Sequence, residues 1–388
     1  MKRFTYFKQW QCTTCGRKYA RDEVTYLCPT CSIDYRPGMP LTGVLEAVFH
    51  YEEISRVLAQ KGRQNYSLRD FCMVFSALEA RDYPPLPVGN TPFYKVESLN
   101  LWIKNDALNP SASFKDRASQ LMVAEAKRLG IGEIACASTG NAASSLAALC
   151  ASAGIKAVIF CPENAPAAKL AQVKAHGAEL HLVTGSYDDA FKAAMEYSAS
   201  HECLNRNTAY HPLTIEGKKS AGLEIYHQNG CKSPDWIIIP VGDGVILAGI
   251  HKAFIDLKRS GQLVKLPRLL AVQAESSDAI TSYWEKGEYQ DAASPETIAD
   301  SISVKTPSNA HWAVRAIKET NGAAIRVSDD EINQARLDLA RKTGVFAEPS
   351  STATLAGLYK AKESGLIRDN EQVVLLITGH GLKDIAGF

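Results

Sequence analysis

The segment EIACASTGNAASSLAALCASAGIKAVIFC, residues 133–161, decides the fold class. Residues 133–137 and 156–161 are short apolar runs, and residues 142–153 between them form an alanine-rich stretch that favours a helix. Two apolar strands joined by a crossover helix are typical of parallel strands, which are buried on both faces. We therefore predict an α/β protein.

The same alternation continues on both sides of this segment. We expect further strands at 99–103, 179–183, 236–241, 269–274 and 373–378, and helices at 113–129, 167–176, 187–200, 215–228, 245–258 and 350–363. Ser328-Asp-Asp-Glu331 matches a capping box before another helix. The residues from about 275 to 322 are expected to be rich in loops. Strands that alternate with helices predict parallel sheets covered on both faces.

The N-terminal 35 residues contain two CxxC pairs, Cys12 with Cys15 and Cys28 with Cys31. Four thiolates from two such turns are typical of a closed tetrahedral zinc site, and a segment this short needs a metal to fold. We interpret residues 1–35 as a structural zinc ribbon; four unrelated thiols or a redox pair are the alternatives. The other six cysteines are expected to be free thiols in a reducing compartment.

Residues 36–90 are expected to link the ribbon to the main body. Short helices are predicted at 41–58 and 68–78, and three prolines, at 84, 85 and 87, end the second one. Residues 88–93 are expected to form a turn that leads into a strand.

Composition excludes several classes of function. The 388 residues carry a net charge of +1, with 43 basic and 42 acidic side chains, so we expect neither a nucleic-acid nor a membrane partner. No apolar run approaches the roughly 20 residues that span a bilayer, and no signal-peptide core is seen before Cys12. We expect a cytoplasmic protein.

Candidate chemistry lies where strands pass into helices, since ligands of such sheets bind at the carboxyl ends of the strands. Asn109-Pro-Ser-Ala-Ser-Phe-Lys115 places a lysine at a predicted helix start, with Ser113 as the N-cap. The positive end of the helix dipole, together with burial, disfavours the ammonium form there. A lysine that sheds its proton can form a Schiff base, although most lysines at helix starts are simply solvated.

Three further loops fit the same position. Ser138-Thr-Gly-Asn141 offers N–H groups and an amide to an anion or a ring oxygen, or is a simple N-cap loop. Gly242-Asp-Gly244 allows the backbone to wrap a phosphate, and it lacks the spacing of a dinucleotide loop because position 247 is Leu. The hydroxyl of Thr378 could face a pyridine nitrogen or cap its own loop.

In this order, the four elements resemble the fold-type II pyridoxal-phosphate enzymes, and threonine synthase has the closest pattern. The family's N-P-T-G-S-F-K-D-R-G corresponds to residues 109–118, its S-S/T-G-N-T to 138–142, its V-G-N-x-G-N to the segment that begins at Val241, and its T-G-x-G-L-K-D to 378–384. Many threonine synthases also begin with a similar cysteine ribbon. The resemblance covers nearly the whole chain.

The resemblance implies a role for each matched residue. Lys115 would be the Schiff-base lysine and the acid–base for the substrate's α-proton. Asn141 would bind the O3′ of pyridoxal phosphate, and Thr378 its pyridine nitrogen. The cofactor phosphate would lie on the backbone of Gly242, Asp243, Gly244, Val245 and Ile246. Ser113, Ser138 and Thr139 are the residues expected to hold the substrate.

The family also commonly has an arginine before its E-G-Q-K stretch, but Thr214 precedes Ile215-Glu-Gly-Lys218 here. The loop asparagine of the family is Asp243, and the threonine after the asparagine of its second loop is Ala142. An aspartate near a phosphate dianion is unfavourable without a compensating cation, for which Lys218, Lys219 and His211 are candidates.

Three functions follow from these matches and departures. The first is threonine synthase, which converts O-phosphohomoserine and water to threonine and phosphate. The second is a divergent lyase of the same family, acting by β-elimination or β-replacement on another, unphosphorylated amino acid. The third is a catalytically silent cofactor-binding or interaction module.

The resemblance implies two doubly wound open-sheet domains with the cofactor in the cleft between them. We expect the larger domain at 91–130 and 215–388 and the smaller at 131–214, in a homodimer that acts on a small amino acid.

Overall fold

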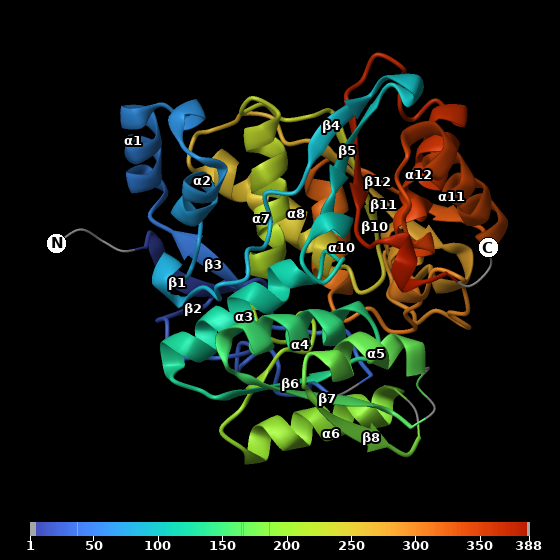
Figure 1. Cartoon of the computed structure of the whole chain (residues 1–388). Coiled ribbons are helices and arrows are strands. Elements are labelled where there is room, and N and C mark those ends of the chain that lie inside the picture. The colour runs from blue at the N-terminus through green and yellow to red at the C-terminus, as the bar shows by residue number, and fades with distance from the viewer. Residues whose placement is uncertain (1–4, 37, 164, 166, 186, 386–388) are drawn as a thin grey trace.

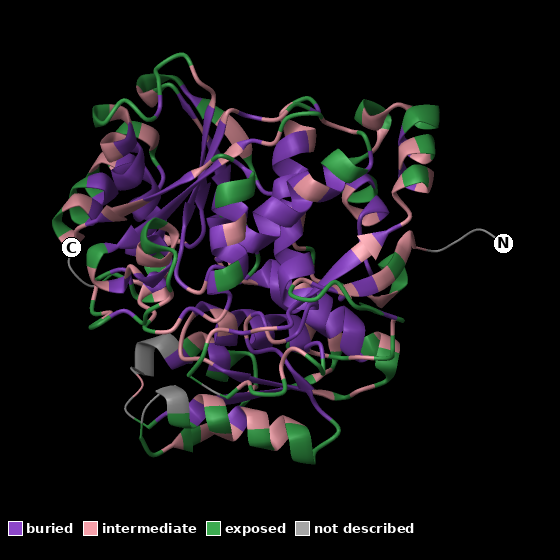
Figure 2. Cartoon of the chain, turned by 180° about the vertical axis from the view of Figure 1, so that it is seen from behind, coloured by how far each residue is buried: buried purple, intermediate pink, exposed green. Residues whose placement is uncertain are grey.

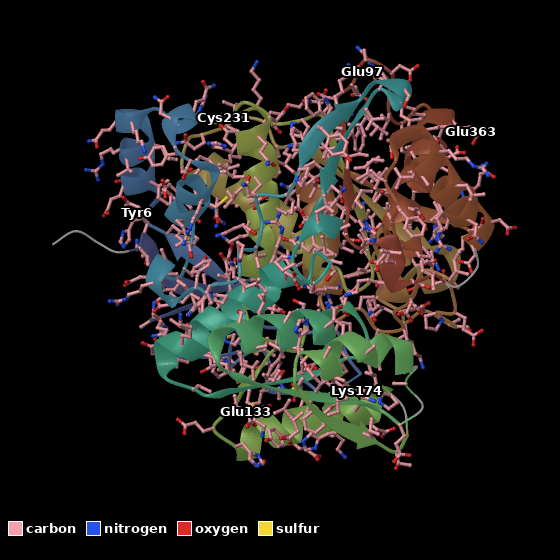
Figure 3. The ribbon with its side chains drawn as sticks, viewed as in Figure 1. Tyr6, Glu97, Glu133, Lys174, Cys231 and Glu363 are labelled. Carbon is pink, nitrogen blue, oxygen red and sulfur yellow. The ribbon has the colours of Figure 1, made fainter. Side chains whose placement is uncertain are left out.

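The computed structural model describes residues 5–36, 38–163, 165, 167–185 and 187–385. Its described part is organised around three sheets (Figure 1). The N-terminal strands lie beside the larger of two α/β units, and the smaller unit lies below both in the view of Figure 1. In Figure 3, Glu97 and Glu363 mark the outer surface of the larger unit, and Glu133 and Lys174 mark the smaller unit.

The larger unit contains a six-stranded sheet in the order β12-β11-β10-β13-β5-β4. The strands are β4 (Phe93–Val96), β5 (Leu101–Asn105), β10 (Trp236–Pro240), β11 (Arg268–Ala274), β12 (Ala323–Val327) and β13 (Val373–Ile377). Every residue of β10 and β13 is buried, as expected for central parallel strands covered on both faces. Only β4 runs antiparallel to its neighbour, so the sheet is mixed.

The smaller unit contains a fully parallel sheet in the order β8-β7-β6-β9. Its strands are β6 (Glu133–Ala137), β7 (Lys156–Pro162), β8 (Glu179–Val183) and β9 (Leu204–Asn205). The crossover helices are α4 (Asn141–Ala153), α5 (Ala167–Ala175) and α6 (Tyr187–Ser200). The segment at 133–161 therefore folds as the predicted strand–helix–strand unit.

The helices α8 (Val245–Arg259), α9 (Ala279–Lys286), α10 (Ala310–Glu319) and α12 (Pro349–Glu363) pack directly on the six-stranded sheet. The helices α7 (Leu213–Gln228) and α11 (Asp329–Thr343) pack mainly on α8 and α12, and α3 (Asp116–Leu129) packs on α7 and α4. Helices α7 and α8 form the buried centre of the molecule (Figure 2). They approach closely because of glycines: a Cβ on Gly222 would lie 2.6 Å from Ala253, and one on Gly249 would lie 2.7 Å from the Cβ of Lys218.

The N-terminal region differs from its sequence prediction. Antiparallel pairing joins β1 (Phe7–Cys12) to both β2 (Lys18–Tyr19) and β3 (Leu45–Phe49). A helix expected at 41–58 is therefore wrong for its first half, and α1 begins only at Tyr51 (Tyr51–Lys61). Helix α2 (Leu68–Val74) lies within the second predicted helix. The strand β3 forms because it pairs with β1, which is distant in the sequence, and the local sequence pattern gives no sign of this pairing.

Two other expectations are corrected by the structure. The stretch before residue 322 contains α9 and α10, although we expected mainly loops. The helix expected from residue 113 begins at Asp116, so Lys115 rather than Ser113 is its N-cap residue. The capping box at Ser328 is confirmed, with both of its reciprocal hydrogen bonds. Within the described residues, no helix is long and apolar enough to cross a membrane.

Candidate active site

A pocket lies where the carboxyl ends of β10 and β13 meet the starts of α4, α8 and α12 and the segment before α3. The lining includes eight of the residues singled out from the sequence: Lys115, Asn141, Gly242, Asp243, Gly244, Val245, Ile246 and Thr378. Thr208, Lys218, Ser301 and Glu348 lie among them. Parallel strands bring these distant segments together because their carboxyl ends share one edge of the sheet.

Lys115 directly precedes α3, in a helical backbone conformation. Its Nζ makes no hydrogen bond or ion pair with any described residue. Burial lowers the pKa of this amine and the nearby Arg206 acts in the same direction, whereas Asp243 and Glu348 oppose the shift. The site thus favours the uncharged, nucleophilic form of Lys115, which is the form that adds to an aldehyde.

Asn141 is the first residue of α4, and its amide is held by a residue that we did not single out from the sequence. Nδ2 of Asn141 donates to Oε2 of Glu348 at 2.9 Å and to Oγ of Ser301 at 3.4 Å. Burial raises the pKa of the Glu348 carboxyl, although Asn141 and Lys115 oppose the shift. Glu348 stands before Pro349 at the start of α12, a polar residue at a helix start that could have signalled a site residue.

The glycine loop forms a backbone cradle at the start of α8. Gly244 is the N-cap residue with φ of +81°, a conformation that side chains other than glycine rarely adopt. A Cβ there would lie 2.8 Å from the Cβ of Ala313. The N–H groups of the first turn of α8 have no preceding helical turn whose carbonyls could accept them. They are therefore free to donate hydrogen bonds to an anion in the pocket.

The carboxylate of Asp243 in this loop is already bound. Its Oδ1 accepts hydrogen bonds from the backbone N–H of Ser308 at 3.2 Å and from the Ser308 hydroxyl at 3.1 Å. Asp243 therefore lines the pocket with its position fixed by a neighbouring segment.

Thr378 directly follows β13 and lines the pocket. Its Oγ1 is 3.0 Å from Oγ of Ser351, which also accepts the N–H groups of Thr378 and Gly379. The threonine is thus held by α12.

The three residues predicted for the substrate lie outside this lining. Ser113 is fully buried and its backbone bridges to Gly379, so it does not reach the pocket surface. Ser138 and Thr139 are half-buried in the turn before α4, where the Ser138 hydroxyl accepts the N–H of Gly140. Lys218, by contrast, lines the pocket.

The four N-terminal cysteines come together away from this pocket. One ligand atom from each of Cys12, Cys15, Cys28 and Cys31 lies within 4.8 Å of the others. The N–H groups of Thr14 and Cys15 both point at Sγ of Cys12, at 3.4 Å. Four sulfurs in this spacing fit a single metal ion of tetrahedral preference. The remaining six cysteines are free thiols.

The pocket combines a lysine with a lowered pKa, a helix start bounded by a glycine of positive φ and a threonine at a strand end. The chain belongs to the pyridoxal-phosphate dependent enzymes: that family, described as "Pyridoxal-phosphate dependent enzyme", matches residues 85–379.

Within this class the chain is a threonine synthase-like lyase. It is 35% identical over 384 residues to threonine synthase of Methanosarcina acetivorans, with 96% of this chain and 92% of that protein covered. It is 34% identical to threonine synthase of Methanocaldococcus jannaschii over the same shares of both chains. It is 40% identical to threonine synthase of a Bacillus species over 76% of this chain and 84% of that protein.

Solved structures give the same fold. The processed form of threonine deaminase isoform 2 from Solanum lycopersicum superposes with a TM-score of 0.68 at 23% identity, covering 81% of this chain and 84% of that one. Maize serine racemase gives a TM-score of 0.65 at 22% identity, covering 76% and 88%. The structural neighbours share the α/β architecture of fold-type II enzymes.

Proposed function

We propose that this chain is a threonine synthase, which converts O-phosphohomoserine and water to threonine and phosphate. The observation that carries the proposal is Lys115: this half-buried lysine has a lowered pKa, makes no side-chain hydrogen bond with a described residue and lines a pocket together with the start of α8 and Thr378. The similarity to curated threonine synthases over 96% of the chain supports the choice of substrate.

The residues present fit pyridoxal phosphate. Nζ of Lys115 would hold the aldehyde carbon, and the N–H groups from Gly242 to Ile246 would bind the phosphate. Thr378 would bind the ring nitrogen through its hydroxyl, and Asn141 would bind O3′. When bound, the cofactor withdraws electrons from the substrate's α-carbon and so makes the α-proton removable. A neutral hydroxyl at the ring nitrogen favours elimination and replacement over transamination.

The side chains of the pocket then have defined tasks. Lys115, whose pKa is lowered by burial, would take the α-proton of the substrate and return it as general base and acid. Glu348 has a raised pKa and therefore can hold a proton beside Asn141. Ser138 and Thr139 precede α4 and would hold the substrate carboxylate together with the N–H groups of their loop.

The overall reaction balances with these tasks. The bond from Cγ to the phosphate oxygen breaks, and its electron pair leaves on phosphate. Cβ loses a proton and gains the hydroxyl of water, while Cγ gains a proton and becomes the methyl group of threonine. No oxidant or reductant is consumed.

The deciding experiment is turnover by the cofactor-loaded enzyme. O-Phosphohomoserine should yield threonine and inorganic phosphate in equal amounts. An enzyme that carries its full complement of pyridoxal phosphate and releases no phosphate would remove threonine synthase from consideration.

A second function has its own supporting observation. Thr214 occupies the position of the family's arginine, and Asp243 that of its asparagine. These departures favour a lyase that carries out β-elimination or β-replacement on an unphosphorylated amino acid. A panel of amino acids scored for keto acid and ammonia would detect it, and Asp243→Asn should then improve the binding of phosphorylated substrates.

The remaining parts of the proposal concern the whole protein. We propose that the four cysteines bind a structural Zn²⁺, because their site offers no open position for catalysis. The two sheets would form the cores of two domains, at 91–130 with 215–388 and at 131–214, preceded by the ribbon at 1–35 and a linker at 36–90. We expect a cytoplasmic homodimer, which light scattering would test.

A further inference from the structure

Most buried cations of this chain have carboxylate partners. Within the described residues, four lysine and arginine side chains that are at most 2% exposed form ion pairs: Lys104 with Glu224, Arg117 with Asp106 and Glu224, Lys219 with Glu216 and Asp256, and Lys252 with Asp256. Such pairing is the rule, because an unpaired buried charge is unfavourable by several kcal/mol. The pocket is the exception.

Lys218 is a buried cation without a partner. It is 1% exposed, lines the pocket from α7, and makes no hydrogen bond or ion pair with any described residue. Its stem is fixed where α7 crosses α8 at Gly249. Burial lowers the pKa of Lys218, and Lys115 and Arg206 lower it further, whereas Asp243 raises it. A bound anion would act in the same direction as Asp243 and restore the charge of this ammonium.

Arg206 is the second such cation, and sequence reasoning did not single it out. It follows β9, is 1% exposed, and its Nη2 has no partner among the described residues. Among the described residues, its guanidinium meets neutral groups: Nε lies 3.4 Å from Oγ of Ser119, Nη1 lies 3.4 Å from Oγ1 of Thr208, and the side chain also contacts the thiol of Cys136. Thr208 lines the pocket, so Arg206 stands directly behind that wall.

Two positions that were candidates for binding or balancing a substrate phosphate, 214 and 219, have other roles in the structure. Thr214 is fully buried, and its hydroxyl donates to the carbonyl of His211 and accepts the N–H of Ala209. It therefore closes a turn at the start of α7 and leaves no room for an arginine. Lys219, one of the candidate compensating cations, is bound by Glu216 and Asp256 away from the pocket.

We propose that Lys218 and Arg206 form the binding site for a phosphate group on the substrate's side chain. The two side chains would bind the phosphate in place of the arginine that the family commonly has at position 214, and they would compensate for the negative charge of Asp243. The assignment rests on the proposed function, since the phosphate is the leaving group of the same reaction. Without substrate, neither side chain has a carboxylate partner among the described residues, and a bound phosphate would supply the missing negative charge.

The test is the binding of inorganic phosphate to the cofactor-loaded enzyme, by calorimetry and as product inhibition. Lys218→Gln introduces the glutamine of the family's E-G-Q-K stretch, so the variant should fold. It should weaken phosphate binding and raise the KM for O-phosphohomoserine, each by about 10- to 100-fold, as expected for loss of a charge-assisted hydrogen bond. Arg206→Gln should act likewise, Arg206→Lys should recover part of the loss, and Lys232→Gln, on an exposed loop, should change nothing.

Each result decides between named alternatives. Unchanged phosphate binding in Lys218→Gln would overturn the proposal. Loss of pyridoxal phosphate from the variant, with phosphate binding intact once cofactor is restored, would also overturn it, because Lys218 would then serve the cofactor. If phosphate binding depends on Lys218 but only unphosphorylated amino acids are turned over, the anion site stands and the threonine synthase reaction falls.

Discussion

At the scale of single residues, burial gives the lysines of this chain different chemistry. Lys115 precedes α3 and Lys219 lies in α7, yet Lys219 is bound by two carboxylates, whereas no carboxylate of the described residues pairs with Lys115. An ammonium that lacks a counter-charge in a buried site loses its proton more easily. The same residue type is therefore structural in one place and nucleophilic in the other.

Replacing Lys115 tests this difference. Lys115→Ala should reduce turnover by about 10³-fold or more, because the base for the α-proton is lost. Borohydride reduction followed by peptide mapping should label Lys115 in the wild type. A pyridoxyl label on Lys218 instead would show that the roles of the two pocket lysines are exchanged.

Glu224 gives a pH dependence with a definite sign. Burial disfavours its ionised form, but Arg117 and Lys104 outweigh burial and lower the pKa of Glu224 to about 2. A carboxyl with a depressed folded-state pKa stabilises the protein above its unfolded-state pKa, and this contribution disappears as the pH falls through about 4.5 toward 2. The linked free energy of unfolding is about 3 kcal/mol.

Glu224→Gln should therefore unfold more easily at pH 7 and should lose less stability than the wild type on going to acid. Denaturant unfolding at a series of pH values measures both effects. Glu363→Gln, on an exposed part of α12, is the matched control and should behave as the wild type. Parallel acid profiles for Glu224→Gln and the wild type would contradict the ion-pair explanation.

At the scale of secondary-structure elements, the start of α8 decides where an anion can bind. The helix can begin at Val245 only because Gly244 takes a left-handed conformation and because no side chain at this position pushes Ala313 away. The turn aims the free N–H groups of a 15-residue helix into the pocket. Backbone geometry, rather than any charged side chain, forms this part of the site.

Gly244→Ala should show whether Gly244 is needed for anion binding at the start of α8 or only for an unstrained backbone. Gly365 has a similar positive φ, of +73° against +81°, but a Cβ there would meet nothing within 4 Å. Gly365→Ala should lose about 1–2 kcal/mol of stability from backbone strain, and Gly244→Ala should lose more because its Cβ would also contact Ala313. Only Gly244→Ala should also weaken pyridoxal-phosphate binding, measured by equilibrium titration of cofactor absorbance. Equal cofactor affinity in the two variants would show that the loop does not hold the phosphate.

At the scale of the whole molecule, the N-terminal unit is part of the main core. Cys12, Tyr19 and Cys28 belong to the same hydrophobic cluster as α7 and α8. The Tyr26 ring stacks on Tyr210 with centroids 4.6 Å apart, and its hydroxyl accepts the N–H of Asn205. The unit therefore supports the segment from 205 to 211, which includes Arg206 and Thr208.

Removal of the metal proposed at the four cysteines should thus affect both stability and the site. Chelation, or Cys28→Ser, should lower the melting temperature by several degrees, because a four-cysteine site contributes folding free energy. It should also raise the KM for substrate, through displacement of Arg206, while the cofactor stays bound. Cys231→Ser replaces a buried thiol that is not part of the four-cysteine site, and it is the control. If the metal-free enzyme remains folded and its KM is unchanged, the N-terminal unit does not support the substrate pocket.

Elements with a local signature were predictable from the sequence. The strand at 133–137, the helix at 187–200 and the capping box at Ser328 all form where their periodicity or cap residues place them. Elements that depend on distant partners were not. The strand β3 exists because β1 offers it a hydrogen-bonding edge, and α10 follows a Pro-Ser-Asn segment that looks like a loop on its own.

The same division applies to the site. The motifs at Lys115, Asn141, the glycine loop and Thr378, taken in order, predicted the class of cofactor from the sequence through their resemblance to a known family. Only the tertiary structure decided that Glu348 and Lys218 line the same pocket and that Arg206 lies behind Thr208. Whether a buried charge is paired depends on which side chains contact it in space. Contacts between residues far apart in the chain produce no sequence motif with a characteristic spacing, so they cannot be predicted from the sequence.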